Sequence, residues 1–173
     1  MNTDLLLVKL HPATVHFPIA LLLLASGCGL LYLYGKRLPL LLHLIWPLML
    51  LGWIGAIVAA LTGLLAQRGL PPQAPYQAIL NWHTTTGLAQ IVVYGALLYQ
   101  RWRYPVLVKQ RAKRKGASPG DPGSSASAHE LLNDNSAKWW ISLLLMSGIL
   151  LIVASGWNGG RLVFEWGVNV VGR

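Results

Sequence analysis

The stretch LLLHLIWPLMLLGWIGAIVAALTGLLA, at residues 40–66, decides the fold because it contains no acidic residue, lysine or arginine. A helix needs a run of roughly 18 apolar residues to cross a bilayer, and this stretch is longer. AILNWHTTTGLAQIVVYGALLY, at residues 78–99, lacks the same charges. Residues 17–34 and 139–157 are also uncharged and just long enough to cross.

The composition agrees with four membrane-spanning segments. Of the 173 residues, 54% are hydrophobic and 11% are charged, whereas charged residues make up about 25% of a soluble domain. We therefore predict an all-α integral membrane protein, a four-transmembrane-helix bundle in the lipid bilayer. A single cysteine and five acidic residues exclude a disulfide framework and argue against carboxylate catalysis. An electron-carrying or accessory subunit is therefore favoured over an enzyme.

The basic residues indicate the orientation. Lysine and arginine accumulate in cytoplasmic loops, and ten of the fourteen basic residues follow the first span, follow the third span or precede the fourth. Both termini are therefore expected on the outward, periplasmic side of a bacterial inner membrane. The net charge of +9 reports this topology and not a nucleic-acid partner.

The chain is expected to divide into three parts. Residues 1–99 would form the first three transmembrane helices, and residues 139–173 the fourth helix with an outward C-terminal segment. Residues 100–138 would form a cytoplasmic loop, basic at first and suited to anionic lipid headgroups. GASPGDPGSSASA, at residues 116–128 of this loop, is low-complexity and expected to be disordered. No internal repeat is evident in the sequence.

Two histidines are candidate ligands of a cofactor. HPATVHFP, at residues 11–18, opens the first span, and Pro12 suits the first turn of a helix. His16 would then lie about one turn inside the outer boundary, and His83 about one turn into the third span, which runs in the same direction. Neutral imidazoles on facing helices are a common way to hold iron in a bundle. His16 and His83 at similar depth therefore predict a haem-like or metal site.

Three further residues could support this site. Gly87 lies one turn after His83, where a missing side chain would let a flat macrocycle approach the backbone. Arg161 could pair with an acidic group of the cofactor or, equally, with Glu165 on the same segment. His11 could be a third metal ligand or could support the site without binding the metal itself. The alternative to a ligand role is the common case in which a histidine near the end of a span only forms a hydrogen bond with a carbonyl.

The residues HPATVHFPIAL at 11–21 and GWNGGRLVFEWGV at 156–168 resemble those of a family of bacterial four-helix membrane proteins named only as a domain of unknown function. The family shows an HPxxVHFP opening and a GGxLV ending. The matching positions are His11, His16, Gly159 and Gly160, whereas Trp166 stands where the family often has a histidine. Some members are joined to Rieske-type domains, so the resemblance implies a respiratory or redox setting.

The leading interpretation is a membrane-embedded subunit of a respiratory or photosynthetic electron-transfer system. It would hold a haem-b-like cofactor, or a chlorin, through His16 and His83, with other membrane protein subunits as partners. One alternative is a cofactor-free accessory or assembly subunit of a larger membrane complex. Another is an outward-facing protein that handles a transition metal with His11, His16 and His83.

Overall fold

Four long helices make up the described part of the protein. The computed structural model describes residues 3–35, 37–114 and 130–168. Its helices are α1 (Thr3–Tyr34), α2 (Pro39–Ala66), α3 (Gln77–Arg114) and α4 (Lys138–Phe164), with the short 3-10 helices η1 (Gln67–Gly69) and η4 (Leu131–Asn133). No strand occurs within these ranges. The all-α prediction is therefore confirmed for the described residues.

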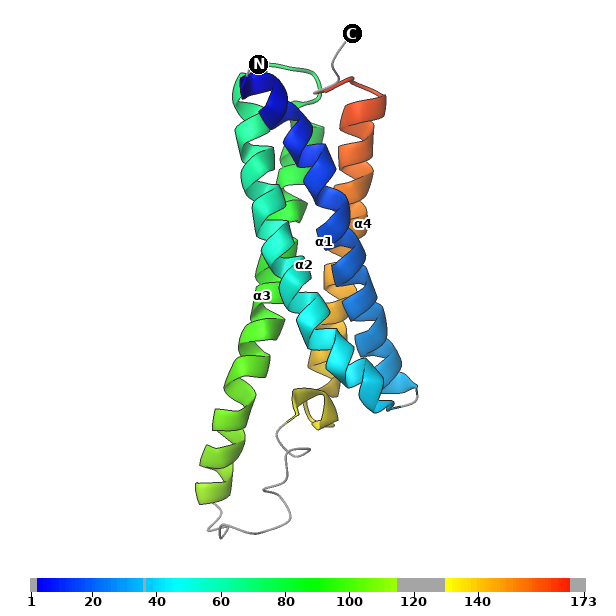
Figure 1. The fold of residues 1–173 in the computed structure, drawn as a ribbon, viewed down its shortest axis with the longest axis vertical. Coiled ribbons are helices and arrows are strands. Elements are labelled where there is room, and N and C mark those ends of the chain that lie inside the picture. The colour runs from blue at the N-terminus through cyan, green and yellow to red at the C-terminus, as the bar shows by residue number, and fades with distance from the viewer. Residues whose placement is uncertain (1–2, 36, 115–129, 169–173) are drawn as a thin grey trace.

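The helices run up and down as two hairpins (Figure 1). α1 packs most extensively on α2 and α3 on α4, while α1 contacts α4 to the same smaller extent that α2 contacts α3. The start of α1 and the end of α4 lie together at one end of the bundle. We call this the histidine end, because His11 and His83 lie near it, and we call the opposite end, where α1 joins α2, the basic end.

Three segments are long and apolar enough to cross a membrane, namely Leu10–Tyr34, Pro39–Gly69 and Lys138–Phe164. Among the described helices α3 does not reach this threshold. Its first turns carry an asparagine, a histidine and three threonines, and its last turns are basic. Length and composition thus support a membrane protein with three candidate spans, whereas the prediction was four.

The helix boundaries differ from those expected at three places. α1 begins at Thr3, so Pro12 lies well inside the helix and not in its first turn. α3 continues to Arg114, so the first part of the predicted loop 100–138 is helical. α4 continues to Phe164 and is closed by Gly167, whose left-handed φ of 63° suits glycine. The Gly159–Gly160 pair therefore lies within α4.

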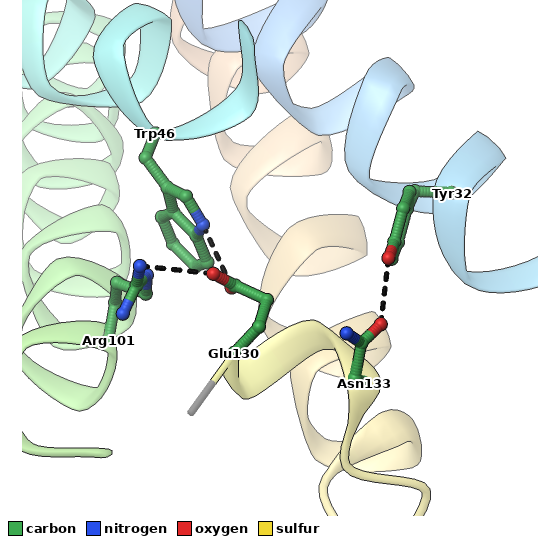
Figure 2. Close-up of polar contacts among 5 residues, drawn as sticks. All are labelled: Tyr32, Trp46, Arg101, Glu130 and Asn133. Carbon is green, nitrogen blue, oxygen red and sulfur yellow. Dashed lines mark hydrogen bonds and ion pairs between the residues drawn. The ribbon is translucent and has the colours of Figure 1, made fainter. Parts of the chain in front are cut away.

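A short segment after the undescribed residues 115–129 packs into the basic end (Figure 2). Leu131 and Leu132 are only 4% and 2% exposed and belong to the core. The buried Glu130 forms an ion pair of 3.0 Å with Arg101 of α3 and accepts a hydrogen bond of 3.0 Å from Nε1 of Trp46 in α2. The predicted disordered linker 116–128 lies outside the described residues, but Glu130, Leu131 and Leu132, which follow it in the predicted loop, are buried.

Candidate cofactor site

His11 in α1 is held against α2. Its Nδ1 lies 2.9 Å from the carbonyl oxygen of Ala59, so Nδ1 carries the proton and donates it to that carbonyl. A Cβ at Gly63 would lie only 2.9 Å from Cε1 of His11. Glycine at this position therefore makes room for the imidazole, and the carbonyl one turn earlier fixes the orientation of the ring.

His83 in α3 is held against α4 in the same way. Its Nδ1 lies 2.9 Å from the carbonyl oxygen of Ser155 and donates to it. A Cβ at Gly159 would lie 3.0 Å from Cε1 of His83. The Gly159–Gly160 pair therefore contains one glycine that the imidazole requires and one, Gly160, whose Cβ would meet no atom within 4 Å.

These matching contacts belong to an internal repeat that relates the two hairpins. Leu22 follows His11 at the spacing at which Tyr94 follows His83, and each packs on a glycine of the partner helix. The Cβ of an alanine would lie 2.8 Å from Leu22 at Gly52 and 2.7 Å from Tyr94 at Gly148. The corresponding positions are His11, Thr14, Leu22, Gly52, Ala59 and Gly63 in the first hairpin and His83, Thr86, Tyr94, Gly148, Ser155 and Gly159 in the second.

The repeat brings the two imidazoles together at the centre of the histidine end. The ring centroids of His11 and His83 lie 6.0 Å apart, and the ring planes are inclined by 80°. Within the described residues neither Nε2 has a hydrogen-bond partner. Because both Nδ1 atoms donate to carbonyls, each Nε2 presents a lone pair that could bind a metal.

A cavity of about 490 Å³ lies between the four helices at this end. His11, His16 and His83 line it, and its walls are otherwise mostly apolar residues of all four helices. Gln90, two turns further along α3 than His83, also lines the cavity. The Oε1 atom of Gln90 is the only buried side-chain nitrogen or oxygen of the described residues that has no hydrogen-bond partner.

The structure pairs His83 with His11, whereas the sequence analysis paired it with His16. His16 is exposed at the cavity wall, and its Nδ1 lies 3.1 Å from the carbonyl oxygen of Pro12. The described rings show no contact between His16 and His83. The reason is the early start of α1, which places His11 inside the helix at the level of His83.

The other predicted site residues have different partners. Gly87 lines the cavity, and a Cβ at this position would make only an ordinary contact of 3.5 Å with Oγ of Ser155. Nε of Arg161 donates to the carboxylate of Glu165 at 2.9 and 3.1 Å, and both side chains are exposed. In the structure Arg161 thus pairs with Glu165, one of the two partners expected for it.

A site built from protein ligands alone is not found in the described part of the chain. No group of three or more histidine, cysteine, aspartate or glutamate side chains is placed there to hold a metal ion. Protein zinc sites use three or four such ligands. The expected set of His11, His16 and His83 therefore does not form a metal-handling cluster among these residues.

The helices and the cavity define the chain as a polytopic membrane protein with a paired-histidine site between two repeated hairpins. No curated protein and no solved structure matches it. Residues 8–172 match the family described as predicted membrane protein (DUF2231). The chain belongs to this family, whose function is unknown.

Proposed function

We propose that this protein is a membrane-embedded subunit of an electron-transfer system that holds a haem-b-like tetrapyrrole between His11 and His83. The observation that carries the proposal is the meeting of these two imidazoles, 6.0 Å apart, each fixed through Nδ1. Two imidazoles that bind one metal ion from opposite sides through bonds of about 2 Å have ring centres about 6 Å apart. The observed separation therefore fits a shared metal ion.

The donor set favours a macrocycle over a bare ion. A tetrapyrrole supplies four nitrogen ligands itself, so the protein has to add only one or two axial ligands. His11 and His83 are such a pair, and no larger cluster exists among the described residues. A histidine that binds a metal through Nε2 usually donates its Nδ1 proton to a carbonyl or carboxylate, as both do here.

The cavity also suits a large apolar group. Its volume of about 490 Å³ lies within the range of roughly 300–1,000 Å³ that is typical of cofactor and ligand sites. Gly63 and Gly159 leave space for the two imidazoles, and the walls of the cavity are mostly apolar. A haem bound there would supply one-electron transfer near one face of the membrane.

We further propose that α3 is the fourth span and that the histidine end faces the periplasm of a bacterial inner membrane. α3 packs on α4 and, less extensively, on α2, and it extends beyond both at the basic end (Figure 1). Three of its polar side chains, His83, Thr84 and Gln90, line the cavity, so fewer polar groups meet lipid than its composition suggests. The basic residues of its extension then lie in the cytoplasm. The electron-transfer partners would be other subunits, including a Rieske-type centre as the family resemblance implies.

The absorption spectrum of the protein purified from a bacterial membrane tests the proposal. We expect a Soret band that shifts on reduction by dithionite. A red-shifted chlorin band without a reducible Soret band would replace the haem by a pigment. A colourless protein that stays colourless after incubation with haemin would contradict the proposal and favour the cofactor-free accessory subunit.

A further inference from the structure

Gln90 has a side-chain amide without a partner in the cavity. Its Oε1 is buried and unbonded, and within the described residues no hydrogen bond of its Nε2 occurs either. Neighbouring polar groups are satisfied. Thr84 accepts a hydrogen bond of 2.8 Å from Gln67, and Tyr94 shares one of 2.8 Å with Ser26. Since an unsatisfied buried polar group costs about 1–3 kcal/mol, the amide of Gln90 calls for an explanation.

Helix packing does not provide that explanation. The repeat relates Gln90 in α3 to Pro18 in α1, an apolar residue that packs on Gly55 of α2. The first hairpin thus forms with an apolar residue at this position, and the second carries an amide instead. An uncompensated amide in a membrane helix bundle is expensive and usually functional. The amide therefore points to a ligand in the cavity.

Position identifies the part of the ligand that Gln90 would meet. Gln90 lies seven residues after His83 on the same face of α3 and thus about 10 Å deeper in the bundle. The acidic groups of a tetrapyrrole are charged and are most stable where they contact water, which is at the open histidine end. The edge opposite to them would then point inward, to Gln90, and only a neutral group is tolerated at that depth.

We propose that the amide of Gln90 hydrogen-bonds an oxygen-bearing substituent, such as a formyl, acetyl or hydroxyalkyl group, on the inward edge of the macrocycle. This inference rests on the proposed function, since it needs a tetrapyrrole held by His11 and His83. An amide can donate to a carbonyl or accept from a hydroxyl. Gln90 is then a specificity-determining residue, which favours a macrocycle with oxygen at that edge over one with only alkyl groups.

Two synthetic haems test this specificity in the intact protein. Diacetyldeuterohaem and mesohaem have the same acidic groups, and they carry acetyl and ethyl groups of similar size at the opposite edge. We expect the wild-type protein to bind the acetyl form roughly tenfold more tightly, as one additional buried hydrogen bond allows. Gln90→Leu should remove this preference. Gln100→Leu, on the same helix but outside the cavity, should keep it.

The stability of the haem-free protein provides a second measurement. Without a ligand the amide is a cost, so Gln90→Leu should melt in detergent at the same temperature as the wild type or higher. A residue that merely supported the fold would lower the melting temperature when replaced. Gln90→Leu should therefore lose the preference for the acetyl group without losing stability, a combination that a purely structural role would not produce.

The outcomes separate the two proposals. If the wild type binds neither synthetic haem nor haemin, the proposed function fails. If the wild type binds both synthetic haems equally tightly, or if Gln90→Leu keeps the preference, the role of Gln90 is wrong while the site of His11 and His83 stands. Melting of haem-free Gln90→Leu well below the wild type would likewise overturn the inference, because it would show that the amide serves the fold.

Discussion

The imidazoles of His11 and His83 lie 6.0 Å apart, and each is fixed from behind by the partner helix of its own hairpin. His11 donates a hydrogen bond to a carbonyl of α2 and His83 to a carbonyl of α4, and both bonds are 2.9 Å long. The two histidines therefore occupy equivalent positions in a repeated unit. A ligand bound by both would connect the two hairpins, which otherwise contact each other less than their own helices do.

The glycine that accommodates His83 can be tested with its own neighbour. Gly159→Ala would place a Cβ 3.0 Å from Cε1 of His83, whereas Gly160→Ala would meet nothing within 4 Å. We expect Gly159→Ala to displace the imidazole and lower haem occupancy, measured as the ratio of Soret to protein absorbance. Gly160→Ala, which adds only one methyl group to the cavity wall, should lower that ratio less. Equal ratios in the two variants would show that the close approach of His83 to α4 is not required.

A second pair of glycines tests the packing of the core. Gly148→Ala would bring a Cβ within 2.7 Å of the Tyr94 ring, which is fully buried and bonded to Ser26. Overpacking of this kind typically costs about 1–3 kcal/mol of unfolding free energy, so the melting temperature in detergent should fall. Gly156→Ala, in the same helix and in open space, is the matched control. A Gly148→Ala variant as stable as this control would contradict the packing of α3 on α4.

The ion pair at the basic end should stabilise the packing of η4. Glu130→Ala leaves Arg101 without its partner and also removes the acceptor of Trp46 Nε1. We expect Glu130→Ala to lower the free energy of unfolding by about 1–2 kcal/mol. This is less than for a fully buried pair, because Arg101 remains partly in contact with water. Glu165→Ala breaks an exposed pair and should not change the melting temperature. The same melting temperature for both variants would refute a structural role of Glu130.

The proposed orientation predicts opposite labelling at the two ends. In a Cys28→Ala background, Gln110→Cys on the extension of α3 should react with a membrane-impermeant maleimide only after the membrane is opened. Gln73→Cys, in the connection between η1 and α3, should react from the periplasmic side in intact spheroplasts. Both positions are exposed. Labelling of Gln110→Cys in intact spheroplasts would reverse the orientation.

The long uncharged stretches predicted the helices but not where they end. Apolar length and missing charges suffice for a span such as 40–66, because the bilayer sets both requirements. They do not limit a helix beyond the membrane, and α3 runs on through basic residues to Arg114. Similarly, polar composition suggested a loop up to residue 138, although Leu131 and Leu132 are buried. Two leucines that pack on helices distant in the sequence produce no periodic pattern of their own.

The histidines could be identified from the sequence, but their pairing could not. A proline next to His11 suggested a helix start, and only the folded chain shows that α1 begins at Thr3. The partners of the imidazoles are backbone carbonyls and glycines of other helices, such as Gly63 and Gly159. A carbonyl has no sequence signature. The repeat is not evident in the sequence for a related reason, since its identical pairs, such as His11 and His83, are widely spaced along apolar helices and other contact positions differ, with Leu22 at the place of Tyr94.

The most direct test of the paired-histidine site is the reduced-minus-oxidised absorption spectrum of three alanine variants, purified in parallel and incubated with haemin. We predict that His11→Ala and His83→Ala each lose the reducible Soret band, because each removes one of the two Nε2 ligands. His16→Ala should keep it, since this side chain is exposed and bonded to its own helix. A spectrum that survives in His11→Ala but is lost in His16→Ala would contradict the account.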